Sequence, residues 1–537
     1  MARPKMLLLW GLLVCAGGFL VSLNGCGGGS GSSMTTPPTA SITASPNPIQ
    51  KGQSTTLTWQ TTNAADISIA GIGTVPASGS QQVAPTTSTS YKLTATGPGG
   101  TQQATTQVTV AANKILHVVV IFQENRTPDN LFHDSVLINR GADIASQGTN
   151  SKGQIITLTP TSLGTNYDLS HAHQAFVNMY DNGKMDGADK IPVTCKNAPP
   201  PCPPPNPWFQ YVNPAEVAPY FQLAETYTFG DRMFQTNQGP SFPAHQYIIS
   251  GTSAPSVGSK LFAAENPIGG PDPFHNAGCI APPAEKVALI DPSGGESQKM
   301  YPCFDHPTLT DELNATTISW RYYSPEAGTI WNGPNAIQHM CAPNAPPPNG
   351  TACTGSDWTN NVVLQYTQVL NDIQSGQLAT VSWVIPDGKS SDHAGGINNS
   401  AGPSWVASVV NAIGNSQYWD DTAIFITWDD WGGWYDHVAP PIRNSYEFGF
   451  RVPLIVVSPY AKAQYVSHVT HDFGSILKYI EEQFGLPSLG YADANADDFT
   501  DCFDYNQVPL IFHTIPAPLD ANHFLQDTSP PTDPDDD

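Results

Sequence analysis

Residues 115–122 read "ILHVVVIF", and "QENRTPDNLFHD" (123–134) follows them directly. A near-continuous run of Val and Ile is typical of a parallel strand that is covered on both faces. Such a strand fills the core and needs no polar residues at its end. Glu124 and Asn125 nevertheless come immediately after it, which predicts that this strand delivers ligands to a functional site.

Three later runs have the same texture and alternate with helical patterns. The clearest helical pattern is "HDFGSILKYIEEQFG" (471–485), in which apolar residues recur at helical spacing and Asp472 can cap the start. We therefore predict an α/β domain with a mostly parallel sheet flanked by helices. The three runs are "ATVSWVIP" (379–386), "TAIFITW" (422–428) and "RVPLIVVSP" (451–459). The Pro- and Cys-rich stretches 195–215 and 265–360 are interpreted as surface inserts.

The first 26 residues have the layout of an export signal. A short basic start, an apolar stretch and small residues precede Cys26. Leu23 to Cys26 also resembles the bacterial lipoprotein box, in which the cysteine is lipidated; a plain signal peptide or an anchor helix remains an alternative. Residues 27–37 are predicted to be a flexible linker. We expect an exported protein that is periplasmic, an outer-membrane lipoprotein, or at the cell surface or secreted.

A separate β-rich segment follows the linker at residues 38–112. Thr-Leu-Thr-Trp (56–59) and Tyr-Lys-Leu-Thr-Ala-Thr (91–96) alternate with period two, and turn residues separate the short strands. This pattern predicts a small immunoglobulin-like β-sandwich, with a role as a spacer or adhesion module. At the other end, residues 516–537 form a C-terminal segment whose acidic tail is predicted to be disordered.

Charge restricts the partners. The 537 residues contain 21 basic and 45 acidic side chains, for a formal net charge of −24, which disfavours nucleic acid and anionic membrane surfaces. We expect contact with a membrane only through an N-terminal lipid anchor. An anionic substrate would have to be met by local positive charge, such as a bound metal.

Seven of the nine cysteines lie outside the export segment, and they form no C-x-x-C zinc pattern. In an oxidising compartment, local disulfides are expected at Cys195–Cys202, Cys279–Cys303 and Cys341–Cys353. Cys502 is left over. The sequence leaves other connectivities open.

Acidic residues follow two of the predicted strands. Glu124 and Asn125 follow the first, and Asp429 and Asp430 follow the strand at 422–428. Sites in open parallel sheets form beyond the carboxyl ends of the strands. Paired acids repel each other unless a cation neutralises them, and their oxygen atoms suit a divalent ion. The alternative is that these acids lie in solvated loops without a ligand. Because acids follow two strands and not one, we favour the metal site over this alternative.

Ser241 is the candidate nucleophile. In "NQGPSFPAHQYIISG" (237–251), Gly239-Pro240 makes a turn and a helix can begin just after it. Ser241 would then lie near a helix N-terminus, where backbone amides favour an anion, and a nearby metal would lower its pKa. An ordinary capping serine is the alternative. A serine hydrolase is disfavoured because the α/β region has no G-x-S-x-G elbow.

Histidines in Gly- and Asp-rich loops complete the set of candidates. Imidazole can bind a phosphoryl oxygen or protonate a leaving group, although a single histidine is more often structural. The candidates are His171, His173, His306, His393 and His437.

Seven ordered blocks resemble the bacterial phosphoesterase family of non-haemolytic phospholipases C and periplasmic acid phosphatases, within the alkaline phosphatase-like superfamily. The resemblance covers residues 114–515. It implies an alkaline phosphatase-like fold and metal-dependent hydrolysis of phosphoric mono- or diesters through a phosphoserine. The blocks are "ENRTPDNLFH", "DLSHAHQAFVNMYDNGKMDG", "GPSFPAHQYIISG", "ISWRYY", "SDHAGG", "DDWGGWYDHVAPP" and "GFRVPLIVVSPYA".

The resemblance also implies roles for individual residues. One divalent metal ion of unidentified kind would be bound by Glu124, Asn125, Ser241, Asp429 and Asp430. Ser241 would be the nucleophile, and the other catalytic residues would be His171, His393 and His437. The substrate, a phospholipid or a small phosphate ester, would contact His173, His245 and His306.

The chain departs from the family pattern at three places. Thr127-Pro128 replaces Ser-Phe, and Asp430 replaces a Glu, which shortens that carboxylate by one methylene. His245 stands where Arg is expected, and imidazole cannot hold a phosphate in the bidentate manner of a guanidinium. Two alternatives stay open. One is a sulfatase or phosphonate-type hydrolase of the same superfamily, against which His245 counts because a formylglycine nucleophile requires a Cys/Ser-x-Pro-x-Arg pattern. The other is a non-catalytic surface binding or adhesion protein.

Overall fold

The computed structural model describes residues 36–49, 54–110, 113–195, 202–270, 275–396 and 400–532. Within these ranges the chain divides into two units: a smaller one whose described residues are 36–46, 56–83 and 90–108, and a larger one that includes everything from Thr109 onward. The predicted export signal and lipoprotein box (1–26), almost all of the linker, and the end of the acidic tail lie outside the described residues.

The smaller unit is built from two sheets with strand orders β1-β2-β5 and β4-β3-β6-β7, in which β1 is antiparallel to β2 and β3 is antiparallel to both β4 and β6. Leu57 and Trp59 in one sheet and Tyr91 and Leu93 in the other are buried, while the residues between them are exposed. This alternation confirms the predicted period-two strands. The immunoglobulin-like assignment stays a prediction. The strands are β1 (Thr39–Ser45), β2 (Thr55–Thr62), β3 (Asp66–Ile69), β4 (Gly73–Thr74), β5 (Ser78–Val83), β6 (Thr89–Gly97) and β7 (Gly100–Val108).

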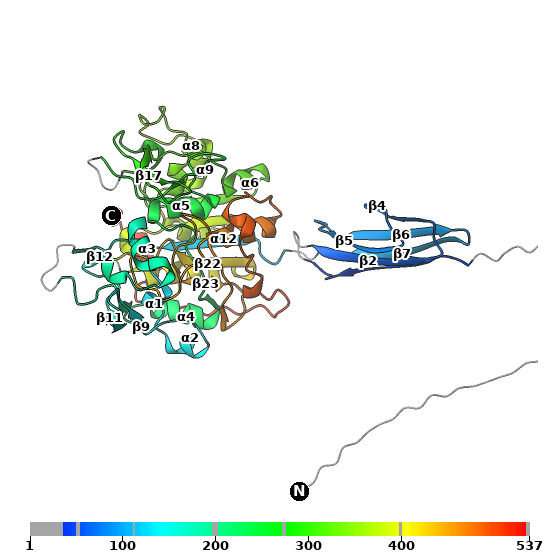
Figure 1. Ribbon diagram of the computed structural model, residues 1–537, viewed down its shortest axis with the longest axis horizontal. Coiled ribbons are helices and arrows are strands. Elements are labelled where there is room, and N and C mark those ends of the chain that lie inside the picture. The colour runs from blue at the N-terminus through cyan, green and yellow to red at the C-terminus, as the bar shows by residue number, and fades with distance from the viewer. Residues whose placement is uncertain are drawn as a thin grey trace, which may run out of the picture. The chain divides into compact units, whose positions relative to one another are not determined.

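The larger unit is an α/β structure with an eight-stranded mixed sheet at its centre (Figure 1). Neighbouring strands run parallel except at β23, which is antiparallel to both of its neighbours. β8 and β22 occupy the middle and are buried on both faces, as the apolar runs predict. In spatial order the strands are β20 (Val362–Val363), β19 (Trp320–Tyr323), β21 (Val381–Val384), β8 (His117–Gln123), β22 (Thr422–Trp428), β23 (Leu454–Val457), β15 (Thr228–Gly230) and β24 (Tyr465–Ser467).

Two expectations about this sheet need correction. The run at 451–459 was grouped with the parallel strands, but its strand β23 is antiparallel to β22. Residues 429–453, which join the two strands, contain no helix, and a parallel return usually needs a helical crossover. Likewise, the stretch 265–360 is not only a surface insert. It contributes β19 to the central sheet, where Trp320 and Tyr322 are buried.

Helices pack around the sheet, and α12 (Phe473–Phe484) behaves as its sequence predicts (Figure 1). The side chain of Asp472 accepts a hydrogen bond from the Ser475 amide at 3.1 Å, and Ser475 Oγ accepts one from the Asp472 amide at 3.1 Å. α12 contacts α5 (Ser241–Ser250). The other α-helices are α1 (Pro128–Leu131), α2 (Ser135–Asn139), α3 (His173–Tyr180), α4 (Ala218–Thr226), α6 (Leu309–Ala315), α7 (Gly333–Ala336), α8 (Gln338–Cys341), α9 (Ser356–Asn361), α10 (Gln368–Gln374), α11 (Gly402–Gly414) and α13 (Ala521–Gln526).

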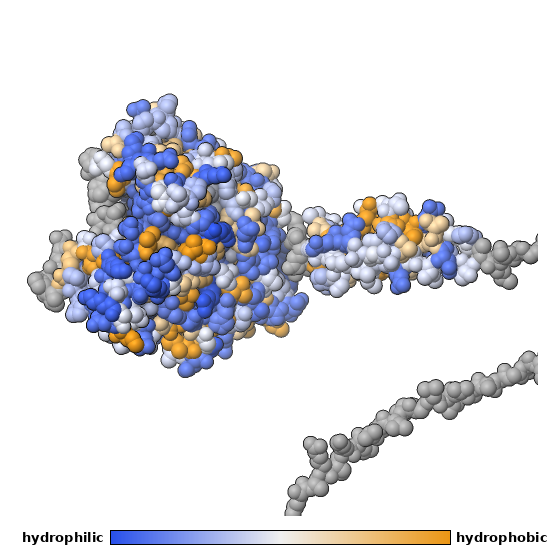
Figure 2. Space-filling model, viewed as in Figure 1, coloured by the Kyte–Doolittle hydropathy of each residue, from blue (hydrophilic) through white to orange (hydrophobic). Residues whose placement is uncertain are grey.

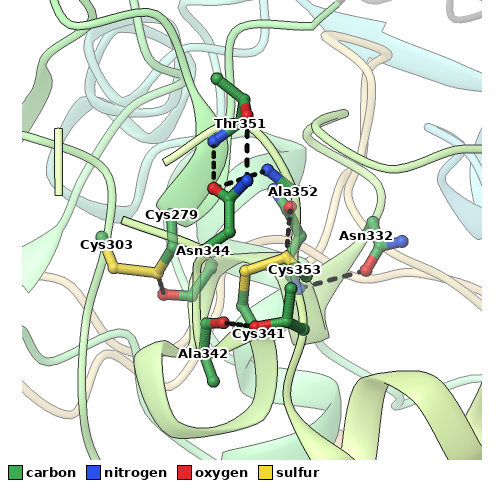
Figure 3. The surroundings of a disulfide bond; sticks show 12 residues. Cys279, Cys303, Asn332, Cys341, Ala342, Asn344, Thr351, Ala352 and Cys353 are labelled. Carbon is green, nitrogen blue, oxygen red and sulfur yellow. Dashed lines mark hydrogen bonds between the residues drawn. A yellow bond between two sulfur atoms is a disulfide. The ribbon is translucent and has the colours of Figure 1, made fainter. Parts of the chain in front are cut away.

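Small sheets and disulfides stabilise the irregular segments of this unit. All three expected disulfides are present: Cys195–Cys202, Cys279–Cys303 and Cys341–Cys353. Two of them lie close to Asn344, whose Oδ1 accepts hydrogen bonds from the amides of Thr351 and Ala352 (Figure 3). The small sheets pair β9 (Gln147–Thr149) with β10 (Ile155–Thr157), β11 (Thr159–Thr161) with β14 (Gln210–Val212), β12 (Tyr167–Leu169) with β13 (Val193–Cys195), and β17 (Val287–Ile290) with β16 (Phe262–Ala263) and β18 (Gln298–Met300).

The visible surface of the larger unit is mainly hydrophilic, and its hydrophobic side chains are scattered in small patches (Figure 2). Among the described residues, no helix is long and apolar enough to cross a membrane.

Candidate active site

The site begins where the two central strands end. β8 and β22 are parallel neighbours, and their last residues, Gln123 and Trp428, are register partners. The pairing continues one step further, because the Asp429 amide donates to the Gln123 carbonyl at 3.0 Å. Glu124 and Asp429 therefore leave the sheet side by side, and both are fully buried. This confirms that the acids predicted at two separate strand ends meet in space.

Asn125 makes the turn that follows β8. Its φ of 64° lies in the left-handed region, which Asn tolerates better than most residues. Its amide donates to Asp429 Oδ1 at 3.1 Å. Gly432, also left-handed at φ +62°, crosses so closely that a Cβ there would lie 2.3 Å from the Asn125 carbonyl oxygen. The two strand ends are thus held together by backbone geometry that needs Asn and Gly.

The side-chain amide of Asn125 lies between the carboxylates and two imidazoles. With its nitrogen turned toward the acids, it donates to Glu124 Oε2 at 3.1 Å and to Asp429 Oδ1 at 3.2 Å. In the same orientation its oxygen accepts from His393 Nε2 at 3.2 Å and from His171 Nε2 at 3.0 Å. Asn125 therefore connects the predicted metal ligands with the predicted catalytic histidines.

Ser241 is the first residue of α5, directly after Pro240. Its Oγ donates to Asp430 Oδ2 at 3.4 Å, and both residues are fully buried. The preceding Gly239 is required by packing, because a Cβ there would lie 2.2 Å from the Ala264 carbonyl oxygen. The predicted turn and helix start are confirmed, and they place the hydroxyl at a helix N-terminus against an acid that follows β22.

His245 lies one turn further along α5 and faces the same acids. Its Nε2 is 3.3 Å from Glu124 Oε1 and 3.9 Å from Asp429 Oδ2. Its Nδ1 lies 3.4 Å from the Tyr322 hydroxyl, which in turn donates to the Trp331 carbonyl. The family resemblance implies that His245 contacts the substrate in the place of an arginine, and this role stays a prediction. In the structure the imidazole lies beside the predicted metal ligands.

Glu124, Asn125, Ser241, His245, Asp429 and Asp430 are called the strand-end cluster from here on. Within it, Glu124, His245 and Asp429 each offer a ligand atom, and these atoms lie within 4.8 Å of one another. Burial raises the pKa of Asp429, which expresses the cost of keeping its charge in this place. Buried carboxylates at such distances are stabilised by a cation, and two carboxylates with an imidazole suit a borderline divalent ion such as Zn²⁺ or Mn²⁺. The donor set fits a metal.

His171 and His393 border the cluster on the side of Asn125. His171 Nε2 is 3.8 Å from Asp430 Oδ2. The rings of His171 and His393 meet edge to face, with their centroids 5.8 Å apart. His171 Nδ1 lies 3.1 Å from the Leu169 carbonyl and His393 Nδ1 lies 2.6 Å from the Ala394 carbonyl. Because a carbonyl only accepts, each ring donates from Nδ1, and it donates from Nε2 to the Asn125 oxygen as well when both of its nitrogens are protonated. Both Nε2 atoms are thereby directed toward the cluster, where they can take or give a proton.

Three residues that support the cluster were not identified from sequence. The carbonyl of Asp392 accepts from Arg126 Nε at 2.8 Å, and its carboxylate accepts from Trp428 Nε1 at 2.9 Å. Burial raises the pKa of Asp392 to about 6 and lowers that of Arg126 to about 10. Tyr322 orients His245 from β19. A sequence signal existed for all three, since Arg126 and Asp392 adjoin candidate residues and Tyr322 lies in the block "ISWRYY", but no role was assigned to any of them.

The other three candidate histidines have different surroundings, and their roles stay predictions. His437 lies 2.7 Å from Asp129 and 2.9 Å from Asp143. His173 lies 2.5 Å from Glu296 Oε1 and 3.3 Å from Gln238 Oε1. His306 lies 2.7 Å from the Ala254 carbonyl, and burial lowers its pKa to about 4. None of these contacts reaches the strand-end cluster.

Comparison with known proteins gives consistent matches. Residues 115–487 match the model of the phosphoesterase family. Phospholipase C B of Mycobacterium tuberculosis is 24% identical over 458 residues, which cover 74% of this chain and 78% of that protein. A non-hemolytic phospholipase C of Pseudomonas aeruginosa is 24% identical over 445 residues, covering 72% of this chain and 57% of that protein. A solved structure from the alkaline phosphatase superfamily of Vibrio parahaemolyticus has a TM-score of 0.33, at 11% identity over 72% of this chain and 71% of that one.

Proposed function

The chain belongs to the phosphoesterase family and is a phosphoric ester hydrolase, and from this premise we propose that Ser241 is the nucleophile that attacks phosphorus. The observation that carries the proposal is the convergence of three distant segments. Residues after β8, residues after β22 and the first turn of α5 meet in one buried cluster. A serine at a helix N-terminus beside buried acids is suited to nucleophilic catalysis.

A divalent cation would be held by Glu124, Asp429 and His245, with Asp430 and Ser241 beside it. When bound, it would supply Lewis-acid chemistry, lowering the pKa of a nearby hydroxyl and neutralising phosphate charge. We also propose that the larger unit has the alkaline phosphatase-like fold that the sequence resemblance implies.

The protein residues have defined tasks in this scheme. Asp430 Oδ2 accepts the hydrogen bond from Ser241 Oγ, takes the hydroxyl proton as Oγ attacks phosphorus, and returns it to Oγ when the phosphoserine is cleaved. The helix N-terminus stabilises negative charge that develops on the hydroxyl and on the phosphoryl group. As Oγ bonds to phosphorus, the ester bond to the leaving alcohol breaks, and His171 or His393 gives that alcohol a proton from Nε2. Water then cleaves the phosphoserine, with the same imidazole taking the proton back.

Phospholipids are the substrate class that we propose, because the similar proteins of Mycobacterium tuberculosis and Pseudomonas aeruginosa are both named phospholipases C. Small phosphate monoesters are the second class within the same proposal. His245 faces the acids, so it is not placed to copy an arginine clamp on phosphate. We infer that the two imidazoles at Asn125 meet the phosphoryl oxygens instead.

The test is a substrate panel on the full chain reconstituted with divalent metals. The arms are phosphatidylcholine vesicles, an aryl phosphate monoester, an aryl phosphodiester and an aryl sulfate. Ser241→Ala is expected to abolish turnover, while Ser408→Ala is expected to retain it, because Ser408 is a buried serine of α11 whose hydroxyl makes no hydrogen bond to the described residues. Full activity of the Ser241 variant would remove that residue from the mechanism. Turnover of the sulfate alone would favour the sulfatase alternative.

Location is proposed from the disulfides and the N-terminal pattern. Three disulfides fit an exported protein. We propose that Cys26 carries the lipid anchor. Labelling with a radioactive fatty acid in a bacterial host, with Cys26→Ser as the control, tests this.

A further inference from the structure

A second group of metal-binding side chains lies at the edge of the central sheet. His471 precedes α12, and Asp501 and Cys502 belong to the short 3-10 helix η7 (Thr500–Cys502). They gather beside β24, the edge strand, which is three strands away from β22 in the sheet. At about 4.8 Å per strand, β24 lies roughly 14 Å across the sheet from β22, the strand that Asp429 follows. The group is therefore separate from the strand-end cluster.

The three ligand atoms have the spacing of one face of a tetrahedral site. His471 Nε2 is 3.9 Å from Cys502 Sγ and 3.6 Å from Asp501 Oδ1, and Sγ is 3.5 Å from the same Oδ1. With bonds of about 2.0 Å to nitrogen and oxygen and about 2.3 Å to sulfur, neighbouring ligands of tetrahedral zinc lie about 3.3 to 3.6 Å apart. One ion fits between these atoms after a small inward shift of the imidazole, since both of the longer distances involve Nε2.

A carboxylate also lies beside the second ring nitrogen of His471, as is usual for metal-binding histidines. Asp497 Oδ1 lies 3.0 Å from His471 Nδ1, on the far side of the ring from Nε2. Asp497 is itself fixed by the Phe499 amide at 2.8 Å, and the Phe499 ring stacks on His471 at 4.4 Å. A carboxylate close to the second ring nitrogen favours the tautomer in which Nε2 can coordinate a metal. This observation is independent of the ligand spacing. Nε2 also lies 3.2 Å from Ser467 Oγ, and this contact gives way when the ion binds.

The remaining ligands are anchored as well. Asp501 Oδ2 accepts a hydrogen bond from Ser467 Oγ at 2.5 Å, which leaves Oδ1 turned toward the imidazole and the thiol. The carbonyl of Cys502 accepts from the Lys462 amide at 2.9 Å. His471 is fully buried, whereas the side chain of Asp501 is 20% exposed, so the carboxylate side offers a path for an ion and a water. Cys502 is the only described cysteine outside a disulfide.

We propose that His471 Nε2, Asp501 Oδ1 and Cys502 Sγ bind a thiophilic divalent cation of the zinc type, with water at the fourth position. Sulfur and imidazole ligands favour Zn²⁺ or Co²⁺ over Mg²⁺ and Ca²⁺. Binding releases the thiol proton to solvent. The ion connects the start of α12 with η7 at the edge strand, and it stabilises the folded chain because the unfolded chain does not present these atoms together.

Cobalt binding to the full chain tests the proposal with a readout that does not depend on turnover. A Cys–Co²⁺ bond produces an intense near-ultraviolet charge-transfer band, and the strand-end cluster contains no sulfur. The wild-type protein and Ser241→Ala are expected to show this band, and Cys502→Ser is expected to lack it. Glu124→Gln, which alters only the strand-end cluster, is expected to keep it.

Equilibrium dialysis against zinc gives the stoichiometry. The wild type is expected to bind one equivalent more than Cys502→Ser, and the zinc-dependent rise in Tm is expected to shrink in that variant. If Cys502→Ser does not fold, Asp501→Asn, which keeps the size of the side chain, takes its place and is expected to weaken this equivalent at least tenfold. A wild-type protein without the charge-transfer band, or a Cys502 variant with unchanged zinc content, overturns the proposal. Either result leaves the role of Ser241 untouched.

Discussion

Replacing Gly432 with alanine is expected to damage the active site, although the substitution removes none of the site's polar side chains. A Cβ at Gly432 would lie 2.3 Å from the Asn125 carbonyl oxygen and 2.8 Å from the Asn125 Cβ. Ordinary carbon–oxygen contacts are about 3.3 Å or longer, so Asn125 must move by about 1 Å. Asn125 holds Asp429 through its amide, and the shift therefore separates the two strand ends.

The magnitude follows from this displacement. A misplacement of about 1 Å in a catalytic site costs about 100-fold in rate, and we expect that loss in kcat/KM for Gly432→Ala. Because alanine at a φ of +62° is strained, the substitution also lowers the free energy of unfolding by about 1 to 2 kcal/mol. The clash is expected to weaken binding of the activating metal as well, because Asp429 is a proposed ligand.

Gly294 offers a matched control. It has a φ of +84° and nothing within 4 Å of the position of a Cβ, so Gly294→Ala carries the backbone cost without the clash. Both variants are assayed for hydrolysis of an aryl phosphate across a metal titration, and their unfolding is measured in urea. The reasoning is refuted if Gly432→Ala stays within about threefold of Gly294→Ala in kcat/KM.

Three further predictions concern pH, metal and disulfides. Burial lowers the pKa of His306 from 6.5 to about 4, so its contribution to stability is present above pH 6.5 and is lost as pH falls to 4. The free energy of unfolding of the wild type should lose about 3 kcal/mol over that window relative to His306→Gln, measured in urea at each pH. Chelation should abolish turnover, and Glu124→Gln should need at least about tenfold more metal for half-maximal recovery. Replacing Cys341 and Cys353 by serine removes a disulfide with a sequence separation of 12, which should cost about 3 kcal/mol in chemical unfolding and leave kcat unchanged. An unaltered unfolding midpoint would contradict this last estimate.

The strands and their polar ends could be predicted because burial on both faces leaves a clear mark in the sequence. "HVVVIF" and "TAIFITW" contain almost no polar residues, so Glu124 and Asp429 stood out at once. If both strands belong to one parallel sheet, their carboxyl ends lie at the same edge, and Glu124 and Asp429 are therefore expected to lie close together. The start of α5 at Ser241 could be anticipated from the Gly-Pro turn before it.

Contacts between distant segments could not be predicted in this way. Nothing local indicates that His245 points at Glu124, because helical position alone does not say which neighbours an element will have. The block "ISWRYY" lies in a Pro- and Cys-rich stretch, and its sequence alone does not indicate that it forms β19 or that the Tyr322 hydroxyl lies beside His245. The antiparallel direction of β23 depends on the path of the chain between strands, which the apolar pattern of the strand does not encode.

The most direct measurement of the central claim is the identity of the residue that becomes phosphorylated during turnover. The full chain, reconstituted with metal, is mixed with an aryl phosphate, quenched in acid within the first turnover, digested and examined by mass spectrometry. The account predicts one phosphoserine, in the peptide that contains Ser241, and no phosphopeptide from Ser241→Ala. Turnover with phosphate on a different residue, or undiminished turnover in Ser241→Ala, would contradict it.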